Sequence, residues 1–119
     1  MTDNATGAAG TDSPLRFRRA TLADLPAIVA MLADDELGAK REDPSIPLNP
    51  RYTSAFTAIE QDPNQFFAVV ERDAHLVGCL QLSFIPGLSR LGQWRGQIES
   101  VRIASSSRGQ GLGRTMFEW

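Results

Sequence analysis

The sequence predicts a mixed α/β domain of the α+β kind, with the element order β-α-α-β-β-β-α. Three observations predict this class. Residues 15–20 and 65–103 contain segments in which apolar and polar residues alternate, as in half-buried strands. Residues 22–35 and 50–61 instead repeat apolar residues at helical spacing. The chain of 119 residues is long enough for one domain with its own core.

Composition narrows the classes of partner. Apolar residues make up 42% and charged residues 22%, which is typical of a soluble globular protein. The formal net charge of −2 gives no excess of positive charge for nucleic acid or an anionic membrane. No apolar run reaches the roughly 18 to 20 residues of a membrane span, and the N-terminus lacks a hydrophobic signal core. We therefore expect a cytoplasmic protein that binds neither nucleic acid nor membrane.

The first elements follow a polar N-terminal segment. Residues 1–14 are predicted to be a disordered tail, and residues 15–119 the domain. In the strand 15–20, Leu15 and Phe17 point inward. Thr21 is typical of a helix N-cap, and Asp24 completes an acidic form of the capping box. The helix should run from about Leu22 to Asp35, with an apolar stripe of Leu22, Leu25, Ile28, Val29 and Leu32.

A long loop and a second helix come next. Glu36–Asn49 is polar and contains Gly38, Pro44 and Pro47, which predicts a loop. Asn49 as cap and Pro50 at the first position predict a helix start, and Asp62-Pro63-Asn64 ends that helix. The expected buried face is Tyr52, Ala55, Phe56 and Ile59.

Three further strands complete the predicted sheet. Gln65–Glu71 and His75–Ile85 form a hairpin around a tight turn, and Trp94–Ile103 follows the Gly-containing loop Pro86–Gln93. On the second of these strands one face is expected to hold Leu76, Gly78, Leu80, Leu82 and Phe84. From Gly109 onward a further helix should open.

The segment Arg108-Gly109-Gln110-Gly111-Leu112-Gly113 is the most informative in the chain. Glycines between a strand and a helix let several backbone N–H groups approach one anion, and the helix dipole adds attraction. Arg108 can add a bidentate phosphate contact. A Walker A loop would end in Gly-Lys-Ser/Thr, and a Rossmann loop would follow the first strand with spacing G-x-G-x-x-G. Neither pattern fits.

The pattern Arg-x-x-Gly-x-Gly instead resembles the acetyl-coenzyme A loop of the GNAT superfamily of N-acetyltransferases. The likeness extends to Arg18–Ile28 as the family's first strand and helix, to the hairpin ending in Val77-Gly78 as its second and third strands, and to Ile98–Ile103 as its fourth strand. It covers Leu15 to Trp119. The resemblance implies the GNAT fold with a mixed sheet. The family's fifth strand would lie beyond Trp119, so we expect the domain to be truncated at its C-terminus, with the general acid left unassigned.

The resemblance also implies how acetyl-coenzyme A is held. The pyrophosphate would meet the backbone amides of Gly109, Gln110, Gly111, Leu112 and Gly113, with the Arg108 side chain nearby. Val101 and Ile103 would offer backbone groups to the pantetheine arm. The acetyl group would pass directly from the thioester to an amine, with no metal and no covalent enzyme intermediate. A homodimer is an assembly to test for.

Glu99 is the candidate general base. An alkylamine has a pKa near 10, so a carboxylate must take its proton before or during attack. Two-residue spacing predicts that Glu99 and Val101 share one face of the strand. The alternative is a surface charge paired with Arg95 or Arg102.

Other residues admit a functional and a structural interpretation. Cys79 is either a nucleophile or, as we favour, a small buried thiol. His75 is interpreted as a solvated turn residue rather than a catalyst. Trp94 and Tyr52 shape the amine site or fill the core, and the loop Pro86–Gln93 flanks the acceptor or is a plain hairpin connection.

The leading functional expectation is acetylation of a primary amine on a small molecule. A protein or peptide N-acetyltransferase is the first alternative. A non-catalytic acyl-coenzyme A binding module and an inactive fragment are the others. The sequence does not identify the acceptor amine.

Overall fold

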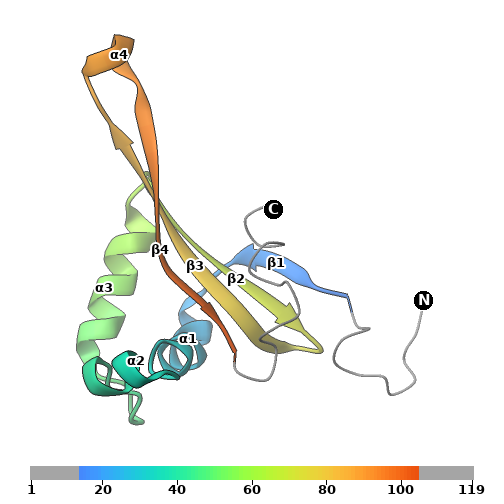
Figure 1. The fold of residues 1–119 in the computed structure, drawn as a ribbon. Helices are drawn as coiled ribbons and strands as arrows, with labels where there is room; N and C mark the ends of the chain where they lie inside the picture. Colours follow the sequence, from blue (N-terminus) through green and yellow to red (C-terminus); the bar gives the residue numbers. More distant parts are fainter. Residues whose placement is uncertain (1–13, 105–119) are drawn as a thin grey trace.

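The computed structural model describes residues 14–104, which fold as four strands and a group of helices. The strands β1 (Arg16–Arg19), β2 (Gln65–Arg72), β3 (His75–Pro86) and β4 (Trp94–Ile103) form one antiparallel sheet in the order β1-β2-β3-β4. Helices α1, α2 and α3 lie together beside this sheet (Figure 1). The predicted α+β class is confirmed. The expected tail and the expected helix after Gly109 lie outside the described residues.

The first helical region begins where the sequence predicts and ends earlier. Thr21 N donates to Asp24 Oδ2 at 2.8 Å, which is the predicted capping box. A 3-10 turn, η1 (Leu22–Asp24), leads into α1 (Leu25–Leu32). The predicted end at Asp35 is therefore wrong by three residues. Leu22 is also wrong as a core residue, because in η1 it points outward and is 53% exposed, whereas Met31 is buried.

The predicted loop after α1 contains a helix, α2 (Glu36–Arg41). Asp35 caps it, since its carboxylate accepts from Gly38 N. Gly38 allows α2 to follow α1 closely, because a Cβ at this position would lie 1.9 Å from the carbonyl oxygen of Leu32. This glycine serves a tight helix–helix junction rather than a loop, which is why the loop prediction was wrong for residues 36–41.

The second predicted helix is confirmed as α3 (Pro50–Gln61). Asn49 Oδ1 accepts from Arg51 N at 2.9 Å, and Pro50 takes the first position. Phe56 is buried on the inner face. Tyr52 and Ile59 pack beside the core, whereas Ala55, predicted to be buried, is exposed.

The sheet carries a hydrophobic cluster on each face. The helix-side cluster consists of Ala20, Leu25, Ile28, Val29, Met31, Phe56, Phe67, Val69 and Cys79. The opposite cluster consists of Ala68, Val70, Val77 and Leu80, with Leu15 and Phe17 packed against it as predicted. Helix α1 contacts β3 and β4, and α3 contacts β2. Among the described elements, these helices cover the helix-side face.

A bulge in β3 changes which side chains share a face. Val70 pairs with Gly78 and Glu71 pairs with Leu76, so Val77 is an extra residue on β3. Leu76 therefore packs against the helix-side cluster, while Leu80 belongs to the opposite one. The prediction that Leu76 shares a face with Leu80 is wrong for this reason.

Beyond the helices, β3 and β4 continue as a long two-stranded arm (Figure 1). Its tip is the short turn α4 (Ser89–Gly92), in which Arg90 and Leu91 have φ of 54° and 63°. Large apolar side chains are exposed along the arm, namely Phe84, Leu88, Leu91 and Trp94, and Ile98 is exposed just before the arm begins. None of the described helices is long and apolar enough to cross a membrane.

Candidate active site

A second bulge, in β4, determines the geometry of the candidate site. Gln81 pairs with Glu99 and Cys79 pairs with Arg102, so β4 has one more residue than β3 in this interval. Ser100 carries the irregularity, with φ of 55°. The buried Cys79 Sγ donates to the Ser100 carbonyl oxygen over 3.6 Å. The bulge is thus anchored to the sheet interior.

The bulge places Glu99 and Val101 on opposite faces of the sheet, which overturns the predicted shared face. Val101 and Ile103 pack against the opposite cluster. Glu99 pairs with Gln81, and Gln81 lies on the helix side with Phe67 and Cys79. Two-residue spacing puts side chains on one face only where the strand is regular. At the bulge the extra residue reverses that relation.

A cavity of about 130 Å³ lies between helices α1 and α3 and the sheet, and we call it the helix–sheet cavity. Its sheet end is formed by Gln81 and Ser100, which are the cross-strand partner and the chain neighbour of Glu99. The remaining lining residues are Leu25, Ile28, Val29, Leu32, Tyr52, Ala55, Phe56, Ile59 and Phe67. Glu99 itself is exposed, on the same face as this cavity.

Gln81 and Tyr52, two of the residues that line the helix–sheet cavity, have hydrogen-bond partners. Gln81 Nε2 and Ser83 Oγ each donate to Gln65 Oε1 at 2.9 Å. Tyr52 Oη donates to Glu42 Oε1 at 2.7 Å and accepts from Asp43 N at 2.8 Å. Burial, followed by the contact with Glu42, raises the pKa of Tyr52 above its usual range. The phenol is therefore neutral near pH 7, and its ring is held in place as a cavity wall.

The alternative interpretation of Glu99, an ion pair with a neighbouring arginine, does not describe the observed contacts. Arg102 Nε lies 3.5 Å from Asp35 Oδ2, and Arg102 Nη1 donates to the Val101 carbonyl oxygen. Among residues 14–104 no ion pair joins Glu99 to Arg95 or Arg102. The carboxylate is left exposed beside the helix–sheet cavity.

Cys79 and His75 take structural positions. Burial raises the pKa of the Cys79 thiol to about 12, and the thiolate needed for nucleophilic attack is therefore suppressed. The favoured interpretation as a buried thiol is confirmed by its zero exposure. His75 is exposed at the start of β3, next to the Asp73-Ala74 turn. Within the described part of the chain, no three His, Cys, Asp or Glu side chains gather as metal ligands would.

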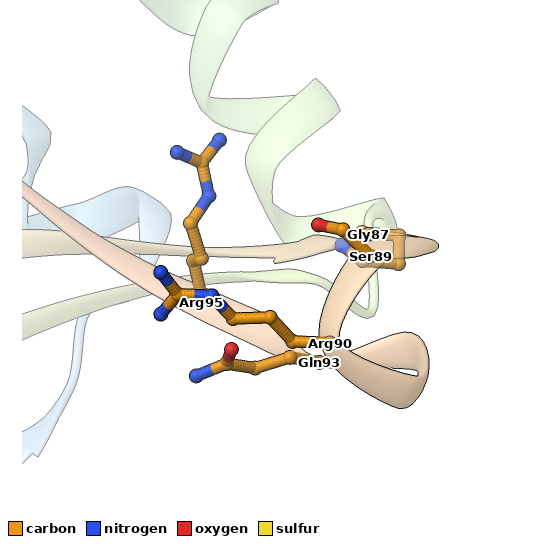
Figure 2. A pocket seen from close by; sticks show the side chains of 6 residues that line it. Gly87, Ser89, Arg90, Gln93 and Arg95 are labelled. Carbon is orange, nitrogen blue, oxygen red and sulfur yellow. The ribbon is translucent and has the colours of Figure 1, made fainter.

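A larger, open cavity of about 490 Å³ occupies the tip of the arm (Figure 2). It is lined by Pro86, Gly87, Ser89, Arg90, Gln93 and Arg95. The side chains of Arg90 and Gln93 extend in the same direction there (Figure 2). The segment 86–93 is thus the connection of the β3–β4 hairpin, and it lies far along the arm from the helices (Figure 1). Trp94 sits on the arm, 56% exposed, and does not line the helix–sheet cavity, whereas Tyr52 does.

Some of the predicted cofactor-binding residues lie in the part of the chain that the structure describes, and the others lie outside it. The loop from Arg108 to Gly113 lies outside the described residues. Val101 and Ile103 lie near the end of β4, which is an edge strand of the described sheet. Their side chains pack inward, so β4 presents backbone N–H and C=O groups along its outer edge. The expected backbone contacts of Val101 and Ile103 to a pantetheine arm stay a prediction.

Comparisons with known proteins identify a family and several solved structures of similar fold. Residues 28–119 match the acetyltransferase (GNAT) family. A crystal structure of a transcriptional regulator from Bacillus halodurans C-125 is 43% identical, with a TM-score of 0.85 over 89% of this chain and 71% of that one. The search of curated proteins returned no match.

Two further solved structures share the fold at lower identity. Glucosamine-6-phosphate N-acetyltransferase from Arabidopsis thaliana is 18% identical with a TM-score of 0.71, over 88% of this chain and 70% of that one. A predicted acetyltransferase from Clostridium acetobutylicum, solved with acetyl-CoA, is 18% identical with a TM-score of 0.66 over the same shares.

Proposed function

The chain belongs to the acetyltransferase (GNAT) family, and on that premise we propose that it transfers the acetyl group of acetyl-CoA directly to a primary amine of a small molecule, with Glu99 as general base. Acetyl transfer from acetyl-CoA follows from family membership. The acceptor class and the role of Glu99 are the proposal.

One geometric observation carries the proposal. The bulge at Ser100 turns Glu99 toward the face that holds the helix–sheet cavity, while Val101 and Ile103 pack on the other face. A carboxylate, a cavity and the outer edge of the described sheet thus meet within a few residues of β4. The thioester can lie along the edge and the amine can approach its carbonyl carbon from the helix side, which would bring the two reacting atoms together in one orientation.

The chain's own groups then have defined tasks. Glu99 accepts the proton of the bound ammonium group, directly or through one water molecule. The freed nitrogen lone pair attacks the thioester carbonyl carbon and forms the C–N bond of a tetrahedral intermediate. The C–S bond then breaks as the carbonyl re-forms, and the nitrogen loses its second proton to solvent, which leaves a neutral amide. The thiolate leaves with the electron pair and is protonated by a group that the described residues do not identify. The backbone edge near Val101 and Ile103, with the loop from Arg108 to Gly113, holds the acyl donor.

The test of the base is Glu99→Gln, which keeps the size of the side chain and removes its basicity. We expect kcat/KM to fall by about 10²-fold or more, and the acidic limb of the pH–rate profile to disappear. Glu60→Gln is the matched control, because Glu60 is an exposed carboxylate on α3 that does not line the helix–sheet cavity. A Glu99→Gln protein with the wild-type rate and profile would remove Glu99 from the mechanism.

The acyl donor is tested separately with Gly111→Glu. A glutamate adds bulk and negative charge where the loop is expected to meet the pyrophosphate, so the Kd for coenzyme A, measured by calorimetry, should rise at least tenfold. Gly96→Glu is the control, since a Cβ at Gly96 meets no atom within 4 Å. Equal affinities for the two variants would exclude the loop from the site.

A second candidate function is control of transcription, and the observation that favours it is the name of the 43% identical chain from Bacillus halodurans. A non-catalytic acyl-CoA binding module would fit that role, and a protein or peptide acceptor is a further option. A thiol-release assay with amine and peptide panels separates these candidates. Binding of coenzyme A without release of free thiol from acetyl-CoA would favour the regulatory module.

A further inference from the structure

We propose that the acceptor amine carries a compact apolar group, a branched aliphatic chain or a phenyl ring, which the helix–sheet cavity receives. This inference rests on the proposed function and names its substrate class. Three features of the helix–sheet cavity support it: the apolar lining, the volume and the position beside Glu99.

The lining of the helix–sheet cavity disfavours a charged group on the acceptor. Apart from Gln81 and Ser100, every lining residue is apolar or aromatic, and no charged side chain is among them. The amide of Gln81 is already engaged with Gln65 Oε1 at 2.9 Å. A second ammonium group or a phosphate on the acceptor would find no counter-charge there, and burial of an unpaired charge is strongly unfavourable. Polyamines and phosphorylated amino sugars are thus poor occupants.

The volume sets the size of the apolar group. The cavity measures about 130 Å³, and an apolar protein cavity of about 150 Å³ in another protein holds one benzene molecule. The deepest walls are Ile28, Val29 and Phe56, which are at most 3% exposed and belong to the helix-side cluster. A group of up to about six carbon atoms therefore fits against the core without displacing it.

The position of the cavity sets the orientation of the acceptor. Its polar end is formed by Gln81 and Ser100, and Glu99 adjoins both through the strand register and the chain. An amine whose apolar group points inward leaves its nitrogen at this end, beside the carboxylate. The binding energy of the apolar group is thus used to orient the amine nitrogen, which is the nucleophile.

The part of the cavity lining that α3 provides offers a matched pair of variants. Ala55 and Ala58 are both exposed alanines on α3, and Ala55 lines the cavity whereas Ala58 does not. Ala55→Phe should fill part of the cavity, and Ala58→Phe adds the same side chain outside it. Thermal unfolding of both variants controls for folding. If Ala55→Phe fails to fold, Ile59→Ala replaces it, because a larger cavity should shift preference from benzylamine to 2-naphthylmethylamine.

The experiment measures direct binding and turnover with benzylamine, ethanolamine and spermidine as probes. We expect benzylamine to have the lowest Kd and KM. Ala55→Phe should raise the Kd and KM for benzylamine at least tenfold and leave those for ethanolamine within twofold of wild type. Ala58→Phe should leave the values for both amines unchanged. Acetyl transfer that prefers spermidine or ignores Ala55→Phe would overturn the inference and leave the proposed function standing. Benzylamine binding that Ala55→Phe abolishes, without transfer to any amine, would sustain the cavity site and overturn the proposed function.

Discussion

Arg18 joins the end of β1 to the start of α1, and its replacement by methionine should destabilise the wall of the helix–sheet cavity. Arg18 Nη1 lies 2.6 Å from Asp24 Oδ2, and Nη2 lies 2.8 Å from Asp24 Oδ1, which is a bidentate pair. Nη2 also donates to Glu71 Oε2 at 3.1 Å. Methionine retains an unbranched apolar chain and removes the guanidinium group.

The magnitude follows from the pKa of Asp24. Arg18, followed by hydrogen bonds from Thr21, outweighs the effect of burial and lowers this pKa from 3.8 to about 2. The Asp24 side chain is only 11% exposed, so solvent screening is limited. A lowering of this size corresponds to about 2 kcal/mol of folding free energy. Because Thr21 supplies part of it, we expect Arg18→Met to cost between about 1 and 2 kcal/mol at pH 7.

The pH dependence tests the electrostatic origin of that cost. A carboxyl whose pKa is lower in the folded state stabilises the fold above its unfolded pKa, near 4, and loses this contribution as the pH falls to about 2. Urea unfolding should therefore show a difference between wild type and Arg18→Met that is largest at pH 7 and shrinks toward pH 2. Arg16→Met is the control, since Arg16 is 74% exposed and lies 3.4 Å from Glu71, and should cost less than about 0.5 kcal/mol. A difference for Arg18→Met that is constant with pH would show that packing, not the ion pair, is responsible.

Two further predictions concern the β4 bulge and the residue that anchors it. Ser100→Gly should preserve stability and rate, because glycine accepts the observed φ of 55°. Ser100→Val should lower the free energy of unfolding by about 1 to 2 kcal/mol and should lower kcat/KM by displacing Glu99. Thermal unfolding and initial rates measure both, and equal behaviour of the two variants would contradict the role of the bulge. With its pKa raised to about 12, Cys79 should react with iodoacetamide at pH 8 about 10³-fold more slowly in the folded than in the unfolded protein, as followed by mass spectrometry. Rapid labelling of the folded protein would show that the thiol is accessible.

Local sequence patterns were sufficient to predict most helices and strands of the described fold. The Thr21–Asp24 capping box, the Asn49 cap of α3 and the β2–β3 hairpin were predicted from residues within one turn of each other. Such features depend on hydrogen bonds between near neighbours, which the sequence displays directly. Helix α2 was missed because Gly38 is needed for the close approach of its backbone to the Leu32 carbonyl. The composition of residues 36–41 does not reveal this contact with the end of α1.

By itself the sequence determined the α+β class, the positions of the four strands along the chain and, through the Arg108–Gly113 loop, the family resemblance that the match over residues 28–119 confirms. Only the tertiary structure decided which face each site residue occupies. Alternation predicts faces on the assumption of a regular strand, and the extra residues at Val77 and Ser100 break that regularity. A bulge arises from the pairing of two strands rather than from either one alone. The position of Glu99 beside the helix–sheet cavity, rather than beside Val101, could therefore be read only from the assembled sheet.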